Sequence, residues 1–269
     1  MLTALSALRR SSRGRLGAFA LAVAATASIL GPATHALGDT GPARPTGAAG
    51  VYKWGPQAWR DEYESGIGSR YVWSDRAQVE NRFGMLVLKG RTDGGATNAK
   101  LLDHTYRYGR WETRIHLRQW ADQTQPFRML VELVPTNAPY DCGAHNIVLA
   151  DYTMGDNLVH FAIRNGGRSY TYAVQPNLGT QDWNTFAVEV ARNHIAWFVN
   201  DKVVMNERDP GALSGLTYTL RYRWYGPNGA VRPPWMQMDW SRYYTMHLPS
   251  QLPLDAPSAE VSSYAASSC

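Results

Sequence analysis

The chain has 269 residues and a mass of 30.0 kDa, enough for one large domain or two small ones. Its mean hydropathy of -0.37 excludes a multi-span membrane protein, and 18% charged residues are too few for a disordered chain. The 24 Gly and 15 Pro favour a turn-rich fold. The 10 Trp and 15 Tyr combine an apolar face with a polar tip, which suits sugar-binding clefts as well as ordinary sheet packing.

The N-terminal segment is typical of a signal peptide. Four arginines between residues 9 and 15 precede an apolar run from Leu16 to Leu30, and residues 1–36 contain no Asp or Glu. The run is short for a bilayer span, and Thr34-His35-Ala36 places small residues at the −3 and −1 positions of a cleavage site. We therefore expect residues 1–36 to be removed on export, by general secretion or by a twin-arginine route. An uncleaved anchor is the alternative.

Export changes what the charge implies. Removing the four arginines from a net charge of +5 leaves +1, so the basic composition does not indicate a nucleic-acid partner. We expect a secreted or cell-envelope protein with no transmembrane segment in the mature chain. Its two cysteines, Cys142 and Cys269, form either a disulfide, which we favour in an oxidising compartment, or two separate thiols.

Composition predicts the domain boundaries. Small residues at 37–50 indicate a linker, residues 51–249 a single domain, and residues 250–269 a poorly packed C-terminal tail.

The central region is dominated by strict alternation of apolar and polar residues. From Arg110 to Leu117, the side chains of Trp111, Thr113, Ile115 and Leu117 share one face. The same pattern predicts four further inward-facing sets: Phe186, Val188 and Val190; Ile195, Trp197 and Val199; Leu220, Tyr222 and Trp224; Met236, Met238 and Trp240. Asn200-Asp201 between two of these runs predicts a tight hairpin turn. Many short strands without a βαβ rhythm predict an all-β sandwich of two antiparallel sheets.

Four groups of residues in order resemble one known family. They are Trp59–Tyr63, Tyr108–Glu112, Asp182–Phe186 with Ile195–Lys202, and Met238–Tyr243. These segments are similar to the framework of family 16 glycoside hydrolases, the laminarinase and β-glucanase group, over about residues 52–246. The resemblance implies a concanavalin-like β-jelly roll with a concave sheet that forms a polysaccharide groove. We expect a monomer whose partner is a β-glucan or another cell-wall glycan.

The resemblance also locates the catalytic strand and shows that it is degenerate. Such enzymes retain configuration with two carboxylates in a pattern Glu-x-Asp-x-(x)-Glu. Here the nucleophile position is Asn146 and the central position is Val148. The last position is Asp151 if the strand carries a one-residue bulge, and Ala150 if it does not. An amide cannot act as a glycosyl nucleophile, so the standard double displacement is unavailable. Asp151 is then either a lone acid or a strand-end residue.

Glu132 is the second candidate carboxylate. It interrupts the apolar run Met129–Val134, where the resemblance would place a tryptophan of the cleft. A carboxylate there is costly unless it is paired or faces a wet groove. Glu132 is therefore either a catalytic group or the partner of an arginine such as Arg114 or Arg164.

The remaining candidates come from the resemblance and from the aromatic content. The substrate-binding set is Trp120, His145, Arg164, Trp224, Tyr225 and Trp235, with Trp224 also suited to the core and His145 to packing or the surface. We expect no cofactor other than a structural calcium ion, for which Glu62 and Asp239 would supply two of the six to eight oxygen ligands.

Three functions fit the sequence. The first is a secreted polysaccharide-active protein that still cleaves glycosidic bonds, with Glu132 and Asp151 in a rearranged site. The second is an inactive glycan-binding protein of the cell envelope, and the third is a purely structural envelope protein. The separation of the Glu132 and Asp151 carboxyl groups would distinguish hydrolysis from binding.

Overall fold

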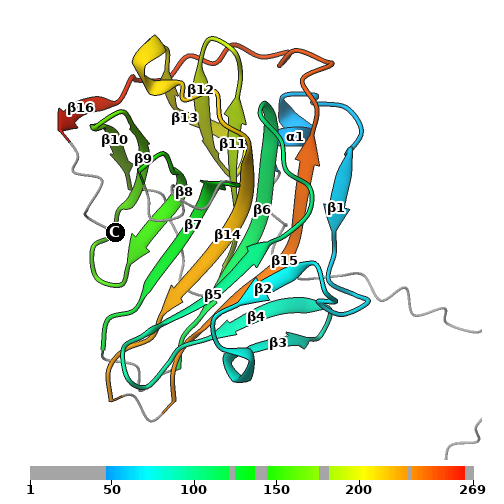
Figure 1. Ribbon diagram of the computed structural model, residues 1–269, viewed down its shortest axis with the longest axis vertical. Coiled ribbons are helices and arrows are strands. Elements are labelled where there is room, and N and C mark those ends of the chain that lie inside the picture. Colours follow the sequence, from blue (N-terminus) through cyan, green and yellow to red (C-terminus); the bar gives the residue numbers. More distant parts are fainter. Residues whose placement is uncertain (1–46, 121–124, 137–143, 176–181, 230–231, 264–269) are drawn as a thin grey trace, which may run out of the picture. The chain divides into compact units, whose positions relative to one another are not determined.

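Two antiparallel sheets, face to face, confirm the predicted jelly-roll sandwich (Figure 1). The computed structural model describes residues 47–120, 125–136, 144–175, 182–229 and 232–263. The predicted signal peptide and both cysteines lie outside these residues, so cleavage and the disulfide stay predictions. No helix in the described ranges is long and apolar enough to cross a membrane.

Sheet A and sheet B each contain eight strands among the described residues. Sheet A runs in the order β13 (Lys202–Glu207), β12 (Ile195–Val199), β11 (Trp183–Val190), β6 (Gly109–Arg118), β15 (Trp235–Tyr244), β4 (Met85–Lys89) and β3 (Val79–Arg82), and β1 (Trp59–Asp61) also pairs with β15. Sheet B runs β16 (Glu260–Ser263), β10 (Arg168–Val174), β9 (Val159–Asn165), β8 (Ile147–Thr153), β7 (Arg128–Pro135), β14 (Tyr218–Tyr225), β5 (Ala96–Leu101) and β2 (Tyr71–Trp73). Short helical turns are α1 (Ala48–Val51), η1 (Arg76–Gln78) and η3 (Pro210–Ala212).

Period-2 alternation directs one face of each sheet into a shared core, as predicted. Trp111, Ile115, Val188 and Trp197 come from sheet A, and Tyr222 belongs to sheet B, and all five are 2% exposed or less. The hairpin is also confirmed, because Val199 pairs with Lys202 across Asn200-Asp201. Asn200 has a φ of 55°, a left-handed conformation that asparagine tolerates better than most residues.

The alternation in β15 breaks at one residue. Met236 and Met238 face the core as predicted, but the register shifts between Met238 and Trp240 because Asp239 is an extra, bulged residue. Trp240 consequently pairs with Arg114 of β6 and points to the outer face of sheet A. There the Arg242 guanidinium carbon lies 3.9 Å from the centre of the Trp240 ring. The expectation that Trp240 shares the face of the two methionines is wrong for this reason.

A buried hydroxyl network joins the two sheets at the centre of the core. Ser241 of β15 bonds Tyr222 of β14, and Tyr222 bonds Thr113 of β6 at 2.9 Å. Tyr63 adds bonds to Ser241 at 2.6 Å and to Tyr71 at 3.1 Å. Burial raises the pKa of Tyr222 to about 12 and raises the pKa values of Tyr63 and Tyr71 well above their ordinary value, so the three phenols are neutral and can both donate and accept. The network therefore fixes the sheets in one alignment.

Ordered segments from both ends of the chain contact the sandwich. In the predicted linker, Ala48–Val51 form α1, and the Ala49 backbone N–H donates to the buried Glu112 carboxylate of β6 at 3.2 Å. In the predicted tail, β16 pairs with β10, and the Leu254 carbonyl accepts from Asn206 at 2.7 Å. Backbone hydrogen bonds to the sandwich order these low-complexity stretches although their side chains carry little apolar signal.

Candidate functional site

A bulge in β8 brings the family-related positions onto one face of sheet B, as the conditional prediction required. Val131 pairs with Ala150 but Glu132 pairs with Val148, so Leu149 is the extra residue of β8. The pairing with β9 shifts by one residue in the same segment. Leu149 and Ala150 both pack in the core, and the Trp197 indole donates to the Val148 carbonyl at 2.8 Å across the sandwich. The bulge therefore turns Asp151 to the outer face that also bears Val148.

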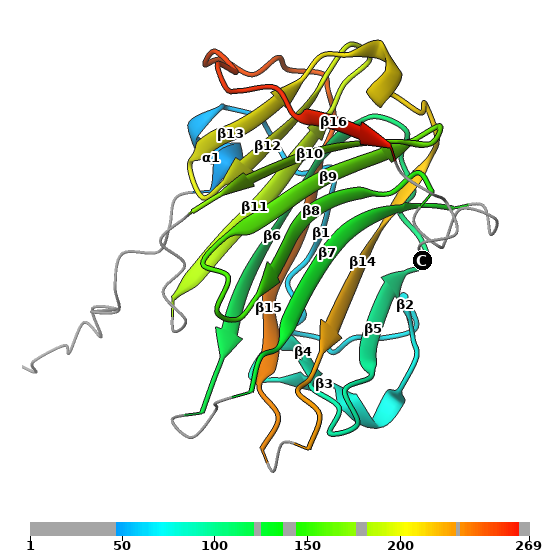
Figure 2. The same ribbon diagram turned by 90° about the vertical axis from the view of Figure 1, so that its left-hand side faces the viewer.

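The outer face of sheet B is defined here by the side chains of β5, β14, β7, β8 and β9 that point away from the core. Figure 2 shows these strands side by side. Cross-strand pairing gives two rows that matter for function: Lys100, Arg221, Glu132 and Val148 in the first row, and Asn98, Arg223, Leu130 and Asp151 in the second. Glu132 and Asp151 are thus diagonal neighbours on adjacent strands.

Glu132 is almost completely buried, with 1% exposure, and is fully engaged by its neighbours. Arg221 donates to Glu132 Oε1 from Nε at 3.0 Å and from Nη2 at 2.8 Å. The Asn146 side-chain amide donates to Oε2 at 2.6 Å. The arginine partner expected from the sequence exists, but it is Arg221, the cross-strand neighbour, rather than Arg114 or Arg164. Glu132 therefore has the surroundings of a structural ion pair at the base of the outer face.

Asp151 is also paired. Its two oxygens accept hydrogen bonds from Arg128 Nε at 2.7 Å and from Arg128 Nη2 at 2.6 Å, which is a bidentate ion pair. The Asp151 side chain is 22% exposed. The hydrogen bond to Asp151 raises the pKa of Arg128. The Arg128 guanidinium also lies 5.4 Å from the ring centre of Tyr225. Asp151 and Tyr225 consequently belong to one surface cluster on sheet B.

The other predicted residues of the degenerate strand lie beside this cluster. Asn146 is 1% exposed, and its Oδ1 has no partner among the described residues. Its backbone carbonyl accepts from the Arg164 N–H at 3.0 Å, which puts Arg164 next to it on β9. His145 contacts Asn165 through Nδ1 at 2.8 Å, so it is held by the end of β9, as the packing alternative predicted.

Three of the predicted aromatic residues do not lie on the outer face of sheet B. Trp224 is fully buried and its Nε1 donates to the Pro234 carbonyl, so it is a core residue and cannot stack on a sugar. Trp120 and Trp235 form an edge-to-face pair with ring centres 5.4 Å apart on the outer face of sheet A. The alternation of β14 and β15 explains both placements. Tyr225 is the predicted stacking residue that shares a face with Glu132 and Asp151.

The predicted calcium ligands do not form a metal site. Glu62 is occupied by Arg242 at 3.0 and 3.1 Å, and Asp239 is occupied by Arg114. No group of three or more Asp, Glu, His or Cys side chains in the described part of the chain could hold a metal ion. Carboxylates that are neutralised by arginine are poor ligands for calcium, which needs six to eight oxygen atoms.

The sequence reasoning missed Arg221 and Arg128, the residues that decide how the two carboxylates behave. The signal for Arg221 was present, because inward-facing Leu220, Tyr222 and Trp224 leave Arg221 and Arg223 pointing outward on the same strand. Arg128 has no comparable signal, since its pairing with Asp151 depends on the bulge in β8.

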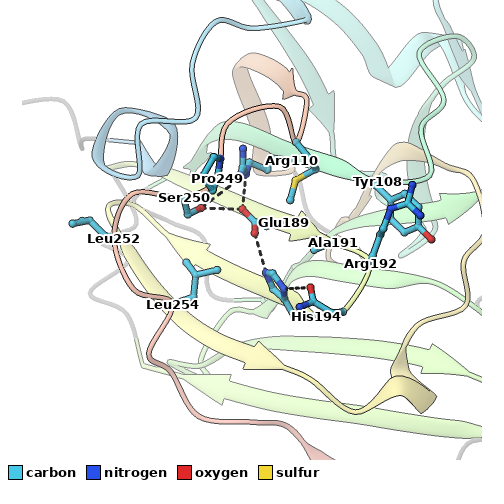
Figure 3. A pocket seen from close by; sticks show the side chains of 12 residues that line it. Tyr108, Arg110, Glu189, Ala191, Arg192, His194, Pro249, Ser250, Leu252 and Leu254 are labelled. Atoms are coloured by element: carbon cyan, nitrogen blue, oxygen red, sulfur yellow. Dashed lines mark hydrogen bonds and ion pairs between the residues drawn. The ribbon is translucent and has the colours of Figure 1, made fainter.

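A cavity of about 630 Å³ lies on the other sheet and is distinct from this face (Figure 3). Glu189 at its base accepts from Arg110, from Ser250 at 3.0 Å and from His194 at 2.9 Å. Burial alone would raise the pKa of Glu189, but the hydrogen bonds of His194 and Arg110 and the charge of Arg110 lower it. Arg110 also donates to the Leu248 carbonyl at 2.8 Å. This network attaches the segment after β15 to sheet A.

Comparison with known proteins supports the fold. No protein-family model matches the sequence, and the search of curated proteins finds no match. Solved structures do match: the laminarinase of Rhodothermus marinus has a TM-score of 0.60 at 13% identity, covering 70% of this chain and 96% of that one. The laminarinase of Flavobacterium sp. UMI-01 gives 0.60 at 13% identity, covering 71% and 100%.

A third match was solved with a ligand. A mutant of SCLam, a non-specific endo-β-1,3(4)-glucanase from family GH16, was co-crystallised with 1,3-β-D-cellotriosyl-glucose; it gives a TM-score of 0.61 at 12% identity, covering 75% of this chain and 98% of that one. The chain is therefore an all-β jelly-roll sandwich. More narrowly, its fold is like that of the family 16 laminarinases and endo-β-1,3(4)-glucanases, as the motifs in the sequence predicted.

Proposed function

We propose that this protein is an exported polysaccharide-binding protein that uses the outer face of sheet B. The observation that carries the proposal is that arginine side chains occupy the carboxylates on that face. Glu132 and Asp151 each accept two hydrogen bonds from an arginine, and the family resemblance puts Asn146, an amide, at the nucleophile position. Tyr225 supplies an aromatic ring on the same face, where a sugar can stack.

Hydrolysis is the second candidate, and one observation favours it. The bulge in β8 puts Asp151 on the same face as Glu132, as a diagonal neighbour on the adjacent strand. The Cα atoms of diagonal neighbours in a sheet lie about 7–8 Å apart, so side chains at such positions can bring two carboxyl groups to the separation of about 6.5–9.5 Å that inverting glycosidases use. Such an enzyme would need Glu132 or Asp151 to release its arginine and to gain access to water.

One experiment separates the two candidates. The purified protein is incubated with a panel of soluble and insoluble wall and storage polysaccharides, and both retention on the glycan and release of reducing ends are measured. Retention without release supports the binding function. Release of reducing ends that is lost in Asp151→Asn would favour hydrolysis, and neither retention nor release would contradict both.

A further inference from the structure

The outer face of sheet B carries more positive than negative charge. On its five central strands the cationic side chains are Lys100, Arg128, Arg164, Arg221 and Arg223, whereas the acidic ones are Glu132 and Asp151. Each of these two acids already forms a close ion pair with one arginine. Neither of these two pairs involves Arg223, so the surroundings of Arg223 bear most directly on the charge of a ligand at this face.

Arg223 is the cationic side chain of this face that is best able to bind an anionic group. Its Nε donates to the neutral Asn98 Oδ1 at 3.1 Å, and its Nη1 lies 3.9 Å from Glu132 Oε1, an oxygen that already receives two hydrogen bonds from Arg221. The Arg223 side chain is 28% exposed. The neutral Asn98 amide therefore orients the Arg223 guanidinium, and Glu132 neutralises its charge only weakly.

The ring of Tyr225 completes a small recognition site next to Arg223. The Arg223 guanidinium lies 5.3 Å from the Tyr225 ring centre, and the two residues are two positions apart on β14, so both point outward. A sugar ring stacks on an aromatic face, and an arginine fork pairs with a carboxylate or sulfate through two parallel hydrogen bonds. A sugar that carries an acidic group satisfies both side chains at once.

We propose that the ligand of this face is an acidic polysaccharide, whose sugar ring stacks on Tyr225 while its carboxylate or sulfate group pairs with Arg223. This inference rests on the proposed glycan-binding function and makes it more specific. Arg221 and Arg128 hold Glu132 and Asp151 in ion pairs, and this reduces their repulsion of an anionic chain.

The test measures binding of the full protein to polygalacturonate, to sulfated dextran and to neutral laminarin at low and high salt. Arg223→Gln is compared with Arg60→Gln, a matched control that removes the same charge from an exposed position on β1 of sheet A. We expect Arg223→Gln to weaken binding to an acidic glycan about tenfold, the scale of one charged hydrogen bond, and Arg60→Gln to change it less than twofold. High salt should weaken binding of the wild-type protein.

The possible outcomes distinguish failure of this inference from failure of the proposed glycan-binding function. Binding to either acidic polymer with selective loss in Arg223→Gln supports the inference, and the preferred polymer identifies the acidic group. Equal losses in the two variants, or binding to laminarin in preference to both acidic polymers, overturn it and leave glycan binding intact. Binding to no polysaccharide contradicts the proposed function as well. If Arg223→Gln does not fold, Arg223→Lys keeps the charge, removes the fork and should lose at least threefold.

Discussion

Removing the arginine from the buried pair Arg221–Glu132 tests whether that pair is structural. Glu132 is 1% exposed and depends on Arg221 for two of its three hydrogen bonds. Stripping a partner from a buried charge costs about 3–5 kcal/mol, and the 13% exposure of the Arg221 side chain lets some water reach the stranded carboxylate. We therefore expect Arg221→Met to lower the free energy of unfolding by about 3 kcal/mol.

The double variant Arg221→Met with Glu132→Leu removes both charges, and replacing a buried pair by apolar side chains is often nearly neutral. We expect it to be more stable than Arg221→Met alone, which defines a coupled pair. Urea denaturation followed by tryptophan fluorescence measures both values. Arg242→Met is the control, because the Arg242–Glu62 pair is 25% and 30% exposed and should contribute about 0–1 kcal/mol. A loss below 1 kcal/mol in Arg221→Met, or additive effects of the two changes, would refute the reasoning.

Three further predictions test other parts of the structure. Burial raises the pKa of Glu112 from 4.5 to about 7, so Glu112 should contribute a loss of roughly 3 kcal/mol of stability as the pH rises from 4.5 to 7, and Glu112→Gln should remove this contribution in denaturation at several pH values. Ser241→Ala leaves the Tyr222 hydroxyl with one partner fewer and should cost about 1–3 kcal/mol in the same assay; no loss would contradict the role of the hydroxyl network. Asn146→Glu alone should create little reducing-end release, and adding Val148→Asp should increase it; equal activity of the two would contradict the role of the central position.

The sandwich could be predicted from the sequence because alternation reports directly which residues face the core. The strands containing Trp111, Trp197 and Tyr222 were found in this way, and so was the turn at Asn200-Asp201. Trp240 was misplaced because a bulge at Asp239 reverses the alternation without any local change in composition. The sequence gives little sign of α1 and β16, because backbone hydrogen bonds attach them to the sandwich and such bonds leave no pattern in the side chains.

The sequence left the candidate site a prediction: it offered an arginine partner for Glu132 but not the identity of that arginine. The resemblance placed Asn146, Glu132 and Asp151 in one region, and the predicted bulge in β8 was needed to bring Asp151 to their face. Which arginine neutralises which carboxylate depends on cross-strand register, and register cannot be read from one strand at a time. Trp120 and Trp235 lie on the opposite sheet: alternation shows that Trp235 points outward, but it does not show which sheet the strand joins.

The central claim is that glycan binds the outer face of sheet B, and a comparison of two aromatic variants tests it most directly. Tyr225→Ala removes the ring beside Arg223 and Asp151, whereas Trp235→Ala removes a half-buried ring from the outer face of sheet A. Calorimetric titration with the polysaccharide best retained by the wild-type protein gives the affinity of each. We predict that Tyr225→Ala weakens binding by roughly 1–3 kcal/mol, the scale of burying a large apolar side chain, and that Trp235→Ala leaves it unchanged. Loss of binding in Trp235→Ala with full affinity in Tyr225→Ala would contradict the account.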